Sequence, residues 1–288
     1  GSSGFYTVNA DAGAAGLVEF SATAEPGAAN SFVFNSISTP QTAGQTFSIT
    51  IEAQDEFDNL ASGYSGSADL TTTAGTITPA TATFSSGQVT LDVSVSEAGT
   101  GQTITATDNT ITGTSNTFDV QSGGVDADNS TVTADPATLQ AGNISTVTID
   151  LRDGSNNPVS GLTDTDFTIG LTGSATETST VTESTAGTYN VTIGNETAET
   201  VSVTVTAGGV TLTDSPSITY TAAASSSLDI QSGNNQTGTV GQALAEAFVV
   251  IVTDEFGNPV VGESVNFAID QTPLGASGQS LSTSSATT

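Results

Sequence analysis

An aspartate and an asparagine four residues apart recur three times in the sequence, each pair followed four residues later by glycine. The copies begin at Asp55, Asp153 and Asp254, in the stretches DEFDN, DGSNN and DEFGN. Carboxylate and amide oxygens are calcium ligands, but calcium needs six to eight of them. Because the middle copy carries a single carboxylate, the pattern favours a structural turn over a calcium loop.

The residue before each asparagine carries the second signal of a turn. Asp58, Asn156 and Gly257 occupy this position, and all three residue types tolerate a positive φ. The asparagine that follows can close an Asx-turn, and a proline after it in two copies stops helical continuation. We therefore predict a left-handed turn at each copy, between two strands.

The spacing of these turns indicates an internal repeat. Asp153 follows Asp55 by 98 residues, and Asp254 follows Asp153 by 101, which is a usual size for one domain. Around the turns, apolar residues alternate with Thr and Ser, as in TFSITIEA, STVTIDL and TVSVTVTA. This alternation is typical of half-buried strands, and no stretch has helical periodicity. The fold class predicted is all-β, with tandem immunoglobulin-like β-sandwich modules of about 100 residues in an elongated array.

Composition limits the possible functions. The 288 residues include 30 acidic residues and one basic residue, Arg152, which gives a net charge of −29. Such a charge repels nucleic acid and anionic membrane surfaces. The absence of His and Cys removes most nucleophile–base pairs, and the absence of Trp weakens sugar binding by aromatic stacking. We therefore expect a protein that is not an enzyme and that needs no organic cofactor.

Two acidic clusters are candidates for calcium. Asp126 and Asp128 lie in VDADNS, after two glycines at an expected module boundary, and Asp164 and Asp166 lie in TDTDF. Calcium at a module joint would stiffen it. The alternative is that these carboxylates are simply solvated, and the sequence leaves both interpretations open.

Three stretches resemble one known group of domains. ADPATLQAGNISTVTIDLRDGSNNPVSGL (134–162) and SGNNQTGTVGQALAEAFVVIVTDEFGNPVVGESVNFAI (232–269) resemble the bacterial immunoglobulin-like domains of the invasin/intimin type, and residues 42–70 are a more divergent relative. The resemblance implies the fold. It implies less about function, because such modules serve in adhesins, surface fibres and secreted enzymes alike.

The repeat divides the chain into four parts. Residues 27–121 and 124–222 are predicted to be complete modules, with 1–26 as the last strands of a partial module and 224–288 as the first strands of another. GFYTVNA near the start matches GTYNVTI late in the second complete module, so Tyr6 and Tyr189 are candidates for a tyrosine corner. Either the sequence is a window on a longer array, or the end strands of one copy complete the next copy head to tail.

The function expected is that of a non-enzymatic extracellular structural protein: the stalk of an adhesin, or a subunit of a cell-surface filament. Its partners would be neighbouring copies or repeats of itself through the end strands, with no membrane insertion within this segment. The alternative is the accessory region of a secreted polysaccharide-degrading enzyme. The ligand of such a stalk is not encoded in any motif that we recognise.

Overall fold

The computed structural model describes all residues from 1 to 288 and is almost entirely β-structure. The only helices are two short 3-10 helices, η1 (Gly13–Ala15) and η2 (Asp164–Asp166), and neither is long and apolar enough to cross a membrane. The all-β prediction is confirmed. By their contacts the residues form two compact units, 1–129 with 152–160, and 130–151 with 161–288.

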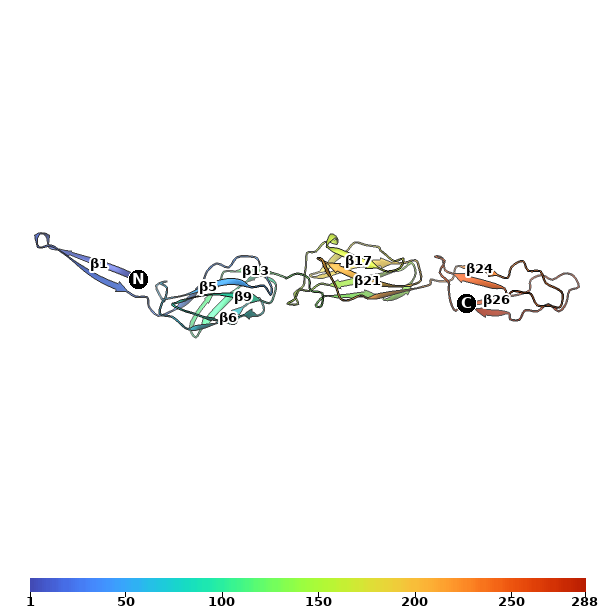
Figure 1. Cartoon of the computed structure of the whole chain (residues 1–288), viewed down its shortest axis with the longest axis horizontal. Helices are drawn as coiled ribbons and strands as arrows, with labels where there is room; N and C mark the ends of the chain where they lie inside the picture. Colours follow the sequence, from blue (N-terminus) through green and yellow to red (C-terminus); the bar gives the residue numbers. More distant parts are fainter. The chain divides into compact units, whose positions relative to one another are not determined.

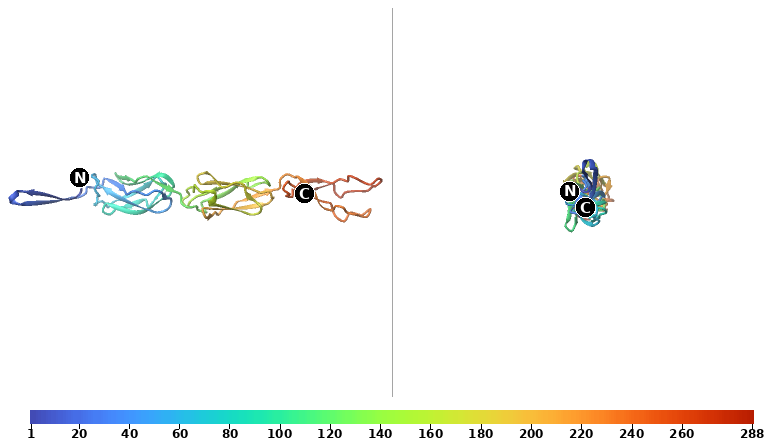
Figure 2. Two further views of the ribbon diagram at one scale, coloured as in Figure 1. Left: turned by 90° about the horizontal axis from the view of Figure 1, so that it is seen from above. Right: turned by 90° about the vertical axis from the view of Figure 1, so that its left-hand side faces the viewer.

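The first unit begins with a two-stranded hairpin, which we call the N-terminal hairpin. Its strands β1 (Gly4–Asp11) and β2 (Leu17–Ala24) are antiparallel, and every residue of both is exposed. No second layer covers either face of this hairpin (Figure 1; Figure 2).

The first sandwich follows in the same unit. One sheet has the strand order β3-β5-β9-β7, and the other strands form sheets ordered β12-β11-β6-β8 and β10-β13-β4. The bounds are β3 Ser31–Phe34, β4 Gln41–Thr42, β5 Phe47–Gln54, β6 Ser67–Thr72, β7 Ile77–Thr78, β8 Thr81–Thr83, β9 Gln88–Val95, β10 Gly99–Gln102, β11 Ile104–Asp108, β12 Ile111–Thr114 and β13 Phe118–Gln121.

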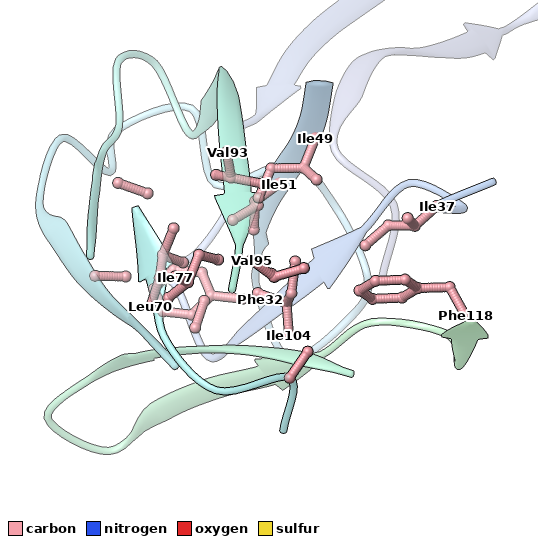
Figure 3. Close-up of a cluster of buried hydrophobic side chains, with 14 of the residues drawn as sticks. Phe32, Ile37, Ile49, Ile51, Leu70, Ile77, Val93, Val95, Ile104 and Phe118 are labelled. Atoms are coloured by element: carbon pink, nitrogen blue, oxygen red, sulfur yellow. The ribbon is translucent and has the colours of Figure 1, made fainter. Parts of the chain in front are cut away.

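Alternation along these strands builds the core of the first sandwich. Ile49 and Ile51 of β5 and Val93 and Val95 of β9 point inward and are at most 2% exposed, and Figure 3 shows them gathered with Phe32, Ile104 and Phe118. Burying a side chain of this size stabilises the fold by about 1.5–3 kcal/mol. The period-two pattern of the sequence therefore determines which face of each strand is buried.

The second sandwich lies in the second unit. Its sheets have the orders β14-β16-β20-β18, with β19 also pairing β20, and β15-β23-β21-β17, with β22 also pairing β21. The bounds are β14 Thr131–Asp135, β15 Thr138–Gln140, β16 Ile144–Asp150, β17 Phe167–Leu171, β18 Thr176–Glu177, β19 Thr182–Thr185, β20 Thr188–Gly194, β21 Thr200–Ala207, β22 Val210–Thr211 and β23 Ser217–Thr221. Val201, Val203 and Val205 of β21 are fully buried.

Tyr189 and Tyr6 differ in their surroundings, although their sequences match. Tyr189 is fully buried, and its hydroxyl accepts the N–H of Leu162 at 3.1 Å. Leu162 is 27 residues upstream, whereas a tyrosine corner bonds the backbone only a few residues upstream, so this hydrogen bond is not that of a tyrosine corner. Tyr6 is 45% exposed, and its hydroxyl donates to the carbonyl of Ser2.

The rest of the second unit, residues 224–288, is here called the C-terminal segment. It contains two separate two-stranded sheets, β24 (Ser227–Ser232) with β25 (Val249–Thr253), and β26 (Ser264–Asn266) with β27 (Ser285–Thr287). Val252 is buried, but Leu228, Ile230 and Phe248 are more than half exposed. This segment therefore consists of two small sheets with little buried apolar core.

Candidate functional site: the Asp–Asn turns

The three Asp–Asn turns have one common hydrogen-bonding pattern. In each turn the Asp N–H donates to the carbonyl of the Asn, at 2.9–3.0 Å. Oδ1 of the Asp accepts two further backbone N–H groups, from the residues two and four positions later, at 2.8–3.0 Å. The residues before the Asn, Asp58, Asn156 and Gly257, have φ of 63°, 67° and 86°. The predicted left-handed turn is confirmed in all three copies.

The second carboxylate oxygen of each Asp accepts a hydrogen bond from the chain that enters the module. Oδ2 of Asp55 accepts the N–H of Gly27 at 2.9 Å. The same bond joins Asp153 to Gly123 at 2.7 Å and Asp254 to Ala223 at 2.8 Å. The residue three positions later in the entering chain also donates its N–H, to the carbonyl of the residue that precedes the Asp, at 2.7–2.8 Å. The turn therefore fixes the start of its own module.

The Asn side chain contacts a loop about 60 residues upstream. Oδ1 of Asn157 accepts the N–H of Ala98 at 3.0 Å, and its Nδ2 donates to the carbonyl of Ser96 at 2.9 Å. Asn258 makes the same two bonds with Ala198 and Glu196, both at 2.8 Å. We call this pair of bonds the latch.

Asn59 makes the third latch, with the first residues of the chain. Its Oδ1 accepts the N–H of Ser3 at 3.0 Å, and its Nδ2 donates to the carbonyl of Gly1 at 2.9 Å. Each latch lies wholly within one of the two units. Because the upstream partners are backbone groups, no residue type in the sequence marks them, and sequence reasoning missed them.

Each Asn side chain also donates to the Asp of its own turn. This bond connects the latch with the Asp that binds the entering chain. Nδ2 lies 2.8–3.1 Å from the carboxylate oxygens in the three copies. All three Asp side chains are at most 3% exposed, and Asn157 and Asn258 are 7% exposed. A buried carboxylate is tolerated only when it is well hydrogen-bonded, and here it accepts at least four bonds.

This hydrogen bonding keeps the carboxylates ionised. Burial would raise the pKa of Asp254, but the bonds from Asn258, Ala223 and Phe256 outweigh it and lower the pKa to about 2. In Asp153 burial is likewise outweighed by the bonds from Asn157, Gly123 and Ser155, and its pKa is lowered. The bond from Gly27 is the main cause of the lowered pKa of Asp55. The turns therefore carry a negative charge at neutral pH that their own N–H groups stabilise.

The carboxylates considered for calcium accept hydrogen bonds from backbone groups. Oδ1 of Asp126 accepts the N–H groups of Asp128 and Asn129, both at 3.0 Å. Asp164 accepts the N–H of Val181, and Asp166 accepts that of Thr163. No group of three or more acidic side chains is gathered where it could hold a metal ion.

The comparison with known domains identifies part of the chain. Residues 126–223, about a third of the sequence, match the family described as "Invasin, domain 3". We call these residues the invasin-type domain after the family that they match. This domain contains the second sandwich and the second Asp–Asn turn, so the resemblance seen in its sequence is confirmed. No curated protein sequence matches the chain.

Solved structures extend the likeness in fold beyond the invasin-type domain. The Escherichia coli adhesin FdeC is 22% identical with a TM-score of 0.53, over 84% of this chain and 81% of that one. InvD of Yersinia pseudotuberculosis is 17% identical with a TM-score of 0.45, over 82% and 73%. Invasin, a bacterial integrin-binding protein, is 18% identical with a TM-score of 0.44, over 84% of this chain and 52% of its own. At this identity the likeness to FdeC concerns the fold alone, that of immunoglobulin-like domains.

Proposed function

We propose that the chain is a stretch of a non-enzymatic, extracellular stalk on a cell surface, which holds an adhesive or protective part away from the cell. The observation that carries this proposal is the repetition of one latch at three places, each joining an Asp–Asn turn to backbone groups about 60 residues upstream. A stalk needs joints that transmit load. Two latch bonds and two bonds from the entering chain hold each joint, and such a joint resists bending better than a free linker. The invasin-type domain and the fold shared with an E. coli adhesin support the same role.

The chemistry of the chain supports a structural role over a catalytic one. The sequence has no His and no Cys, and its most perturbed carboxylates are saturated with hydrogen bonds from their own turns. A catalytic carboxylate needs a pKa matched to proton transfer and access to substrate. Buried carboxylates with lowered pKa values have neither property.

The partners proposed are neighbouring repeats or copies of the same chain, which associate through the end strands. The high negative charge keeps such a surface hydrated and discourages contacts with nucleic acid. Calcium at Asp126 and Asp128 is not part of the proposal, because the latch provides a joint without metal.

Labelling of intact cells tests the proposal. Antibodies raised against the 288-residue chain should bind the source cells without permeabilisation, and external protease should remove the signal. An antibody against a cytoplasmic protein is the control for cell integrity. Labelling that appears only after permeabilisation would refute the surface location.

A further inference from the structure

The N-terminal hairpin has one apolar face that nothing covers. Its pairs Val8–Phe20 and Ala10–Val18 place these side chains on the same face. Val8, Phe20 and Val18 are 65%, 59% and 56% exposed. The middle of the other face is polar, with Thr7, Asn9, Glu19 and Ser21, and the exposed apolar side chains of Phe5 and Leu17 lie near its two ends. A two-stranded hairpin is only marginally stable alone in water, so a partner that covers this apolar face would stabilise it.

The latch shows which strands of a module the hairpin represents. In the first sandwich, Gly99 directly follows Ala98, whose N–H takes part in the latch, and Gly99 pairs with Val120. Val120 lies three residues before Gly123, whose N–H donates to the Asp of the next turn. The hairpin has the same spacing. Gly4 directly follows Ser3, whose N–H takes part in the latch, and Gly4 pairs with Ala24. Ala24 lies three residues before Gly27, whose N–H donates to Asp55.

The invasin-type domain repeats this register. Tyr220, three residues before Ala223, donates its N–H to the carbonyl of Glu199, the residue after the latched Ala198. The next pairs also correspond: Thr200–Thr219 in the domain and Phe5–Thr23 in the hairpin. β1 and β2 therefore stand in the place of β21 and β23.

In the invasin-type domain, β21 is held by a strand that the hairpin lacks. β21 pairs with β17, with Val203 opposite Leu171 and Val205 opposite Ile169. The strand that follows the third turn, as β17 follows the second, is β26 of the C-terminal segment. One edge of β26 pairs with β27, and its other edge has no strand beside it.

The C-terminal segment also offers an apolar cleft. A cavity of about 290 Å³ is lined mainly by Ile230, Phe248, Val249, Phe267 and Leu281. Ile230 and Phe248 are 62% and 51% exposed. The hairpin thus presents apolar side chains without a cover, and the segment presents an apolar cleft beside an open strand edge.

We propose that residues 4–24 of one copy bind residues 224–288 of a second copy, with β1 pairing antiparallel along the open edge of β26 and of the two residues that follow it, Phe267 and Ala268. The proposal rests on the proposed function and deepens it by naming the partner surface. If the inward-facing Phe267 takes the place of Ile169, Ala10 lies opposite Phe267, and the outward-facing Asn9 lies opposite Ala268. The apolar face of Val8, Val18 and Phe20 then covers the cleft.

The complex supplies counterparts of β17, β21 and β23 in one sheet and leaves the other sheet as it is. In the two complete sandwiches, β5 also pairs with β9, and β16 also pairs with β20. The hairpin supplies no counterpart of β9 or β20, so the outer edge of β25 stays open in the complex. Both partners are acidic, so their association should strengthen as salt screens the repulsion.

Engineered cysteines test the register, because the natural chain has none. The full chain carrying Asn9→Cys and Ala268→Cys should form disulfide-linked dimers and longer ladders on mild oxidation. A chain carrying Thr23→Cys and Ala268→Cys is the matched control, because Thr23 lies on β2, away from β26, and it should remain uncrosslinked. Equal crosslinking of the two pairs, or of neither, would overturn the assigned register.

Light scattering tests the apolar contact separately from the register. The unmodified chain should form oligomers that grow with concentration and with salt. Val8→Asp with Phe20→Asp should abolish them, whereas Thr7→Asp with Ser21→Asp on the polar face should leave them intact. A monomer at all concentrations refutes the docking while leaving the surface labelling, and hence the proposed stalk, untouched.

Discussion

The amide N–H of Ala198 donates to Oδ1 of Asn258 at 2.8 Å, across 60 residues of sequence. Nδ2 of the same side chain donates to the carbonyl of Glu196 and to Oδ2 of Asp254, both at 2.8 Å. One asparagine side chain therefore forms hydrogen bonds with an upstream loop and with the aspartate of its own turn at the same time. A hydrogen bond of this kind contributes about 0.5–1.5 kcal/mol net, and a buried partner left unsatisfied costs more.

The first prediction concerns this latch. Asn258→Ala should destabilise the chain by about 1–3 kcal/mol, because it leaves Asp254, Ala198 and Glu196 each without one partner. Denaturant unfolding followed by circular dichroism measures the change. Asn143→Ala is the control, because the exposed Asn143 bonds only the carbonyl of Gln140 with its side chain, and its effect should be within about 0.5 kcal/mol. Equal effects of the two variants would show that the latch adds no stability.

The second prediction concerns stiffness. Replacing Asn59, Asn157 and Asn258 together by Ala should make the joints more flexible, because the linkers then lose their side-chain attachment to the upstream loops. Small-angle scattering of the natural chain and of the triple variant measures this as a broader distribution of interatomic distances. An unchanged distribution would assign the latches to local folding rather than to stiffness.

The third prediction concerns the left-handed residue of the turns. Gly257 has φ of 86°, and a Cβ added there would meet no atom within 4 Å. Gly257→Ala should therefore destabilise the chain by about 1–2 kcal/mol through backbone strain alone. Asn tolerates this conformation better, so Gly257→Asn should cost less than Gly257→Ala in the same unfolding measurement. The opposite order would contradict the strain argument.

The fourth prediction concerns pH. The folded pKa of Asp254 is about 2, and the unfolded value is about 3.9. The stabilisation from the ionised carboxylate is therefore fully present above pH about 4 and is lost as pH falls to about 2. Thermal unfolding from pH 7 to pH 2 should show a steeper loss of stability for the natural chain than for Asp254→Asn. Asp229→Asn, on the exposed strand β24, should keep the natural pH profile.

The fifth prediction concerns calcium. Asp126 already accepts two backbone N–H groups, and a two-carboxylate cluster offers too few oxygens for a tight calcium site. We expect millimolar calcium or a chelator to leave the unfolding temperature unchanged. A rise with calcium that disappears in Asp126→Asn with Asp128→Asn would establish the calcium site for which the sequence makes these two residues candidates.

Much of the structure could be predicted because it depends on local patterns. The alternation of Ile49 and Ile51, or of Val201 and Val203, gives the strand and its buried face from sequence alone. The positive φ at Asp58, Asn156 and Gly257 follows from the residue types that tolerate it. Tyr189 shows the limit of such reasoning, because its match to Tyr6 predicted neither the bond to Leu162 nor the different exposure of the two rings.

The sequence by itself determined the repeat, the all-β class and the turns, because each depends on residue types at fixed spacing. Only the tertiary structure decided what the turns hold. The partners of Asn157 and Asn258 are backbone groups of Ser96, Ala98, Glu196 and Ala198. Every residue has a backbone N–H or carbonyl of this kind, so only folding, which brings a loop 60 residues away beside the turn, selects the ones that bind.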